Sequence, residues 1–467
     1  MNAPYIWIVF PLLVGVILWL LRYKRLAVLI TGVLVCAGLA ILAAILPIGE
    51  SVKIGSLSLE IPSTLTVLGR RFILTNNERP FLTLIYGLGS AWFLGAGITW
   101  AHRFFIPFSL GMIASLVAAL AVEPFLYAAL LVQLAVLFSI PILSPPGNPV
   151  RLGVQRYLLF QTLAMPFILI AGWMLGAGEG TPGGEGLLLR AGIMLGMGFA
   201  FWLAVFPFYA WVPQLTNETH PYPAGFVLSL LPMSMLMLGL DFLNGFSWLR
   251  SNPGLYQILQ FVGILMVVTA GVWSAFQKDL ARLLGYAVIF ETGFALLAVS
   301  LQSLPGMLMF AAGLLPRLLG LIVLTLGLGV VANQEEDLTF EHASGLIQRL
   351  PLAAIAITAA LLSIGGFPTL AGFPVRLEIL EQLGLKSSVV INWVLIGNLF
   401  FLIGAVRVLS QVVRLSTPVW VINESWPQRI LLSAGIVFLV LFGLLPGEFY
   451  ESVLFVLRVA PEMFFSP

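Results

Sequence analysis

The chain has 467 residues, of which 60% are hydrophobic and only 9% are charged, and its mean hydropathy is +1.06. Ordinary soluble domains carry about 25% charged residues, so this composition excludes a soluble fold and predicts an all-α polytopic membrane protein. A net charge of +2, spread along the chain, does not favour nucleic acid as a partner. The single cysteine, Cys36, lies inside an apolar stretch, and the three histidines are His102, His220 and His342, so we expect neither a zinc site nor a cysteine-held cluster, and no other cofactor.

Long apolar stretches of roughly 18 to 25 residues alternate with short charged loops, and this is the length that crosses about 30 Å of hydrocarbon. The pattern predicts about fourteen transmembrane helices. They are expected near residues 5–22, 26–48, 80–101, 104–121, 124–143, 156–176, 189–208, 222–246, 255–275, 282–300, 305–332, 351–372, 390–412 and 428–446.

Residues 51–77 form a long polar segment between the second and third predicted spans. Apolar and polar residues alternate within it, which predicts a short hairpin on the membrane surface. An even number of spans places both termini on one side of the membrane. The distribution of Lys and Arg over the short loops favours an orientation with both termini outside.

Two predicted spans are interrupted by proline. The seventh runs into Phe206-Pro207-Phe208, and the twelfth runs into Gly365-Gly366-Phe367-Pro368. Proline inside a span frees backbone carbonyls and bends or breaks the helix. One broken helix in each half of a chain indicates inverted repeats with an ion path at their interface, although proline is also common in membrane helices without such a role.

Five segments resemble, in order, signature segments of the antiporter-like subunits of respiratory complex I and of Mrp-type cation antiporters. They are R-Y-L-L at 156–159, F-P-F-Y-A-W-V-P at 206–213, K-D-L-A-R-L-L-G-Y at 278–286, G-L-I-Q-R-L-P at 345–351 and G-F-P-T-L-A-G-F at 366–373. The resemblance implies a fourteen-helix fold with two inverted five-helix repeats and broken helices 7 and 12. It also implies other membrane-arm subunits as partners within the lipid bilayer, and coupling of electron transfer to proton or cation translocation.

The resemblance implies four regions along the chain. Three N-terminal helices with the surface hairpin occupy 1–103, and the final helix and C-terminal tail occupy 413–467. The first five-helix repeat lies at 104–246 and the second at 255–412.

The family's ion path needs a glutamate in the fifth helix, lysines in the seventh and eighth, and a lysine or glutamate in the twelfth. Matching motif by motif places Gln133, Trp202, Met233 or Ser234, and Arg376 at these positions. The first three positions cannot exchange protons, and a guanidinium keeps its proton at physiological pH. Most of the family's ion-path residues are therefore substituted.

Glu291 and Arg317 are charges near mid-membrane at positions where the family has other residues. An unpaired charge at this depth is strongly unfavourable, so both need partners. Their helices are consecutive and antiparallel, which predicts a contact between the two side chains, either direct or through one water. The pair is either part of a rerouted proton path or a structural ion pair between helices.

Several functions remain open. One is a subunit that couples electron transfer to ion movement in a complex I-type respiratory or hydrogenase-related complex. A second is a degenerate scaffold subunit that no longer pumps, which the substitutions favour, and a third is a free-standing secondary cation/proton transporter. We expect a multi-pass protein of an energy-coupling membrane, either the cell or plasma membrane. It has no catalytic residue, and at most it is a non-catalytic subunit of an NADH:quinone oxidoreductase-type complex.

Overall fold

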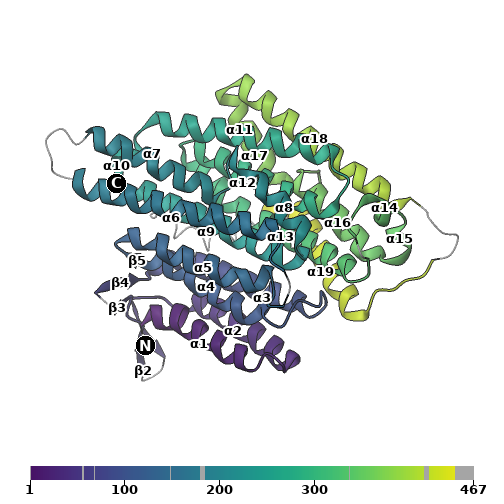
Figure 1. Ribbon diagram of the computed structural model, residues 1–467. Coiled ribbons are helices and arrows are strands. Elements are labelled where there is room, and N and C mark those ends of the chain that lie inside the picture. The colour runs from purple at the N-terminus through teal and green to yellow at the C-terminus, as the bar shows by residue number, and fades with distance from the viewer. Residues whose placement is uncertain are drawn as a thin grey trace.

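The computed structural model describes residues 2–54, 57–67, 69–147, 149–178, 185–335, 337–414 and 420–447. Most of these residues are helical, and the long helices lie side by side with their axes roughly aligned (Figure 1). In chain order the helices are a π-helical turn Tyr5–Val9, α1 (Phe10–Leu20), α2 (Arg25–Ile45), the 3-10 turn Asn76–Glu78, α3 (Arg79–Ala96), α4 (Phe105–Ala121), the 3-10 turn Phe125–Tyr127, α5 (Ala128–Leu143), α6 (Leu152–Gly178), α7 (Glu185–Trp202), the 3-10 turn Phe208–Ala210, α8 (Trp211–Glu218), α9 (Pro221–Gly245), α10 (Ser247–Arg250), α11 (Pro253–Phe276), α12 (Leu280–Ser300), α13 (Leu304–Ala332), α14 (Phe340–Ala343), α15 (Leu346–Arg349), α16 (Pro351–Ile364), α17 (Phe373–Lys386), α18 (Ser388–Val413) and α19 (Trp426–Leu444).

Nine helices among the described residues are long and apolar enough to cross a membrane, and four further apolar helices are shorter. Every span predicted from the sequence coincides with one of the helices. The chain is therefore an all-α, multi-pass integral membrane protein, as its composition predicted.

The predicted surface hairpin is present, but the segment forms two hairpins. The strands are β1 (Ser51–Ile54), β2 (Leu57–Glu60), β3 (Thr64–Val67), β4 (Arg70–Ile73) and, after α4, β5 (Val122–Glu123). All pairs are antiparallel, and β5 extends the second hairpin by pairing with β4. Because β5 lies beyond two helices, alternation within 51–77 alone could not predict it.

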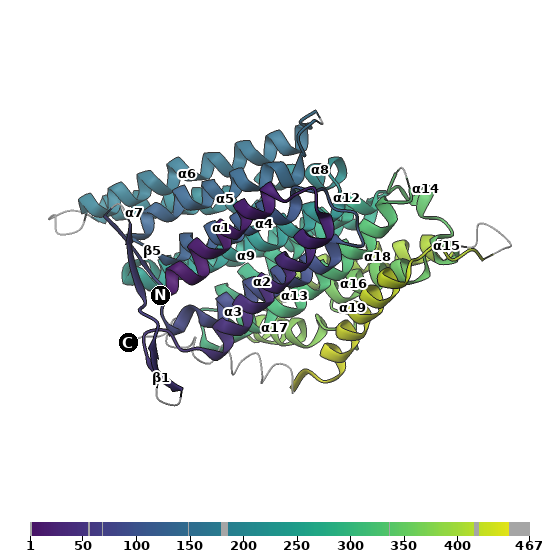
Figure 2. The same cartoon turned by 90° about the horizontal axis from the view of Figure 1, so that it is seen from below.

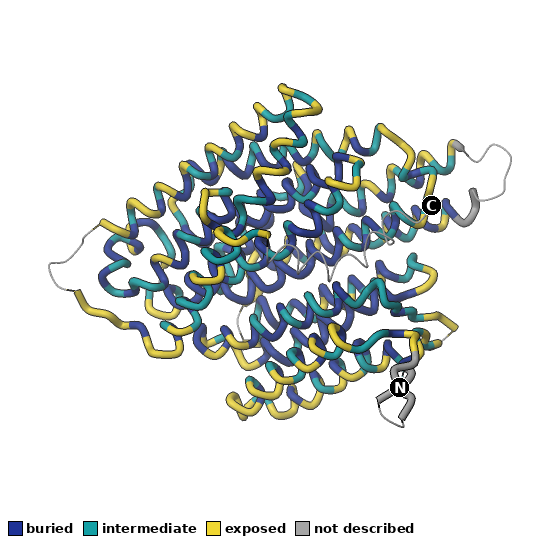
Figure 3. Tube along the Cα trace, turned by 180° about the vertical axis from the view of Figure 1, so that it is seen from behind, coloured by how far each residue is buried: buried dark blue, intermediate teal, exposed yellow. Residues whose placement is uncertain are grey.

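The bundle has a central layer and an outer layer. In α12, 94% of the spanning window is buried within the protein, whereas in α19 only 17% is buried. Figure 2 shows α19 at the edge of the bundle, and Figure 3 shows buried residues inside and exposed ones along the outer helices. Side chains of α12 and α13 thus meet protein rather than lipid.

Both predicted helix breaks are present. The first separates α7 from α8 after Trp202. The Trp202 carbonyl oxygen accepts a hydrogen bond of 3.3 Å from the Gln161 side-chain amide. The second separates α16 from α17, where Gly366 has φ +70°, a conformation that favours glycine. There the Gly372 amide donates to the Ser363 hydroxyl at 3.1 Å, which holds the two sides of the break together.

Candidate functional site: a buried charge cluster beside the second break

Three charged side chains from three helices meet beside the second break. Glu291 lies on α12, Arg317 on α13 and Arg376 on α17, and their exposed fractions are 8%, 3% and 6%. Arg376 Nη2 lies 2.6 Å from Glu291 Oε1, which makes a buried salt bridge. Gly366 makes room for the Arg376 side chain, because a Cβ at position 366 would lie 2.5 Å from Arg376 Cδ.

The predicted direct contact between Glu291 and Arg317 is not among the salt bridges of the described residues, where Glu291 pairs with Arg376. Both side chains line the same cavity, so a contact through one water stays a prediction. Arg317 Nη2 instead donates a hydrogen bond of 3.1 Å to Thr292 Oγ1, whose own proton goes to the Val288 carbonyl at 2.8 Å. The prediction used the adjacency of α12 and α13. It could not include α17, which reaches this depth only because the chain turns at the break.

Aromatic rings also contact the Arg376 guanidinium. Its central carbon lies 3.9 Å from the Phe294 ring centroid and 5.0 Å from that of Phe290. Phe290 stacks in turn on Phe401 of α18, with ring centroids 4.2 Å apart. A cation over a ring face is stabilised most where water is excluded, so these rings help to hold a charge in the bundle.

A cavity of about 40 Å³ lies against the cluster, and Glu291, Arg317 and Arg376 are the charged residues among those that line it. Its other walls are apolar or glycine, including Phe310, Leu314 and Gly372. A water molecule needs about 10–15 Å³ of this kind of volume, so the cavity has room for two or three.

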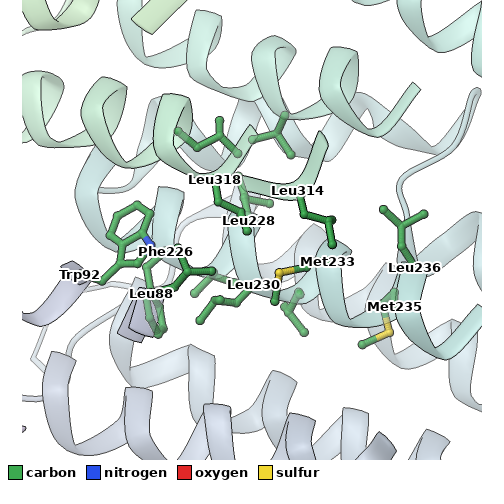
Figure 4. Packing of buried hydrophobic residues seen from close by; sticks show 14 of the residues in the cluster. Leu88, Trp92, Phe226, Leu228, Leu230, Met233, Met235, Leu236, Leu314 and Leu318 are labelled. Carbon is green, nitrogen blue, oxygen red and sulfur yellow. The ribbon is translucent and has the colours of Figure 1, made fainter. Parts of the chain in front are cut away.

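The other family positions lie away from this cavity. The Gln133 amide donates to the Thr162 hydroxyl at 2.9 Å between α5 and α6, and Trp202 ends α7 with only 2% of its surface exposed. Met233 is fully buried, and Figure 4 shows it among Leu230, Leu314 and other apolar side chains. Of the four matched positions, the structure brings only Arg376 to the charge cluster.

The first break has a neutral cavity of about 10 Å³, which is at or below the size that holds one water. Gln161 and Tyr157 are polar groups that line it, and no carboxylate, lysine or arginine is among its described lining residues. The two breaks therefore differ in chemistry: the first is neutral and tightly packed, and the second is charged and hollow.

Several signature segments contact one another where helices meet. Tyr157, from the first segment, packs on Trp211, from the second, with ring centroids 5.4 Å apart. Gly285, from the third, contacts Pro213 so closely that a Cβ would lie 2.7 Å from its Cα. Asp279 caps α12 by accepting hydrogen bonds from two backbone amides. Residues of the first three signature segments thus pack against one another beside the first break.

Sequence reasoning missed two groups. Thr292, the partner of Arg317, adjoins Glu291 in the sequence and could have been noticed as a polar neighbour. Asp241 of α9 is half-buried and lines a second cavity of about 60 Å³ together with Glu78. That cavity shares Phe310 and Leu314 with the cavity of the charge cluster, a relation between distant segments that no local pattern reveals.

Residues 183–404 match the family described as NADH:quinone oxidoreductase/Mrp antiporter, TM. The NADH-quinone oxidoreductase subunit N of Chromohalobacter salexigens is 30% identical over 267 residues, which cover 52% of this chain and 53% of that protein. That of Psychrobacter arcticus is 26% identical over 278 residues, covering 57% and 56%. The chain spans about half the length of the curated relatives it matches.

Solved structures share the fold over nearly the whole chain. A chain of the membrane-bound sulfane sulfur reductase, an archaeal respiratory membrane complex, has a TM-score of 0.81 at 14% identity, covering 99% of both chains. A chain of the Mrp complex from Dietzia sp. has a TM-score of 0.80 at 15% identity, covering 99% of this chain and 97% of that one. A chain of respiratory complex I from Thermus thermophilus has a TM-score of 0.72 at 20% identity, covering 99% of both.

The fold, with its two interrupted helices in a polytopic bundle, is the one shared by these chains of membrane complexes. Residues 183–404 carry the sequence match to the complex I/Mrp antiporter membrane subunit family, and the fold is shared over nearly the whole chain.

Proposed function

We propose that the chain is an antiporter-like subunit of a multisubunit membrane arm that contributes no complete proton path of its own. Its role is to connect neighbouring subunits of the membrane arm and to hold a fixed, buried charge cluster within it. The structural matches support membership of such an assembly, since they come from multisubunit membrane complexes.

The observation that carries this proposal is the chemistry of the first half. Trp202 and Met233 occupy positions where the family resemblance requires lysines, and both are buried. Proton relays through a membrane use chains of ionisable groups or water, and the cavity at the first break offers neither. A proton that entered this half would meet no acceptor at these positions.

The second half keeps charge but in a fixed form. Glu291 is held by Arg376, and neither arginine releases its proton under physiological conditions. The cluster therefore acts as a structural ion-pair network and as a source of electric field.

A second candidate function is proton transfer through Glu291 alone, which the adjoining cavity of about 40 Å³ favours. A free-standing secondary cation/proton transporter is a third candidate. Nothing among the described side chains favours it over the subunit role.

We also propose fourteen spans, made up of the nine long helices, the four shorter apolar ones and α3, with both termini outside. The blocks 104–246 and 255–412 then hold five spans each, and the fourth is interrupted in both. Neighbour relations also match: α4 packs on α5 and α9, as α11 packs on α12 and α18, and α6 packs on α7 as α13 packs on α16. An odd number of spans per block inverts the second block relative to the first.

The test of the first-half claim is ion movement per electron in proteoliposomes that contain the assembled complex. Gln133→Ala and Met233→Leu keep the region neutral and are expected to leave the ratio unchanged. Val437→Leu, on the outer face of α19, is a matched control for complex assembly. A large loss of pumping in Gln133→Ala alone would contradict the proposal.

A further inference from the structure

The charge cluster is not electrically balanced. Two guanidinium groups and one carboxylate line its cavity, so one positive charge is uncompensated among the described residues. The carboxylate is engaged by Arg376, whereas the hydrogen-bond partner of Arg317 among the described residues is a neutral hydroxyl. A buried cation without a counter-charge is strongly unfavourable, so this imbalance calls for a further partner.

The unused hydrogen-bond donors belong to the same two side chains. Nε and Nη1 of both Arg317 and Arg376 are buried and have no protein acceptor among the described residues. Both side chains are more than nine-tenths buried and line the same cavity. Four donor nitrogens and an excess positive charge around one hollow are the elements of an anion site.

We propose that this cavity binds a small monovalent inorganic anion of the chloride class between Arg317 and Arg376. One such ion balances the net charge of the cluster and accepts hydrogen bonds from the unused guanidinium N–H groups. The volume of about 40 Å³ fits a monatomic ion with a water molecule, and it is too small for an organic carboxylate of any length. A divalent anion would leave an excess negative charge.

The anion has a structural role in this arrangement. It holds α13 against α17 in the way that Glu291 holds α12 against α17. This inference does not depend on whether the subunit moves protons, because the charge count is the same in a scaffold and in a pump. Binding is therefore measured directly, without reference to ion pumping.

The experiment uses the full chain purified in detergent and radiolabelled chloride at equilibrium, in sodium gluconate at constant ionic strength. The expected result is a single saturable site from which bromide displaces chloride and gluconate does not. Bromide should also raise the thermal unfolding midpoint along the same saturation curve. Absence of saturable binding means that water alone satisfies the arginines, and it would overturn the proposal.

Two variants shift binding in opposite directions, which a general structural defect would not do. Arg317→Gln removes the unbalanced charge and is expected to weaken chloride binding by roughly tenfold or more. Glu291→Gln removes the competing carboxylate and is expected to tighten binding by a similar factor. Arg282→Gln, an exposed arginine at the start of α12, is the matched control. Unchanged affinity in folded Arg317→Gln would place the bound anion elsewhere.

Discussion

Glu291 lies in a helix whose surroundings are almost entirely protein, where a lone carboxylate would be costly. Its salt bridge to Arg376 has both partners at least nine-tenths buried. Pairs of this kind contribute little relative to a well-packed apolar pair, but removing one partner leaves an uncompensated charge. The cluster is therefore sensitive to single substitutions and more tolerant of paired ones.

We expect Glu291→Gln and Arg376→Gln each to lower the free energy of unfolding by about 3–5 kcal/mol, the usual effect of breaking a buried pair. The double variant should lose clearly less free energy of unfolding than the sum of the two single losses. Unfolding of the purified chain in mixed micelles measures this double-mutant cycle.

Glu335 and Arg349 are the matched control pair, because Arg349 is 35% exposed and the pair lies outside the bundle core. Their coupling should stay below about 1 kcal/mol. A stronger coupling of Glu291 to Arg317 than to Arg376 would contradict the arrangement described here.

At the scale of helices, the second break depends on close backbone approach. A Cβ at Gly372 would lie 2.0 Å from the Ser363 carbonyl oxygen, so the two sides of the break cannot keep their spacing with a larger residue. The break in turn positions α17 and therefore Arg376.

We expect Gly372→Ala to lower the thermal unfolding midpoint and to weaken the coupling between Glu291 and Arg376. Gly196→Ala is the control, because a Cβ there meets nothing within 4 Å and alanine stabilises a helix by up to about 1 kcal/mol relative to glycine. Equal effects of the two substitutions would show that the close approach at Gly372 does not matter.

The sequence predicted the elements better than their contacts. Apolar length located the spans, and Pro207 and Gly366 located the breaks, because these are local properties of the chain. The depth of Glu291 also followed from counting residues along its helix. Its partner did not, because the direction of α17 depends on how residues 365–372 fold, and spacing along the sequence does not encode that.

At the scale of the whole chain, the order of helices places the segment between α17 and α18 on the same side as the hairpins, and the α14–α15 segment on the opposite side (Figure 1). Single cysteines in place of exposed Ser388 and Glu341 should therefore react with an impermeant maleimide from opposite sides of intact cells, with Ser388→Cys labelled from outside. The native Cys36 is buried and serves as the unlabelled background. Labelling of both positions from one side would exclude the proposed fourteen-span topology.

The two halves of the molecule differ most in where they keep charge. The first break is lined by neutral residues around a cavity of about 10 Å³, and the second holds three charged side chains beside a cavity of about 40 Å³. In the proposed role, the subunit transmits structure and electric field along a membrane arm, because a complete proton path requires exchangeable groups that the matched positions of the first half do not supply.

The most direct test of this account is the number of ions moved per electron by the assembled complex when Glu291 and Arg376 are both neutralised. Glu291→Gln/Arg376→Gln removes the carboxylate of the cluster together with its partner, so assembly is preserved better than in either single variant. With assembly verified by subunit stoichiometry, we expect the same ratio of ions per electron as in the wild type. A decrease in the number of ions moved per electron that equals the contribution of one pumping subunit would contradict the proposed function. It would assign proton transfer to Glu291.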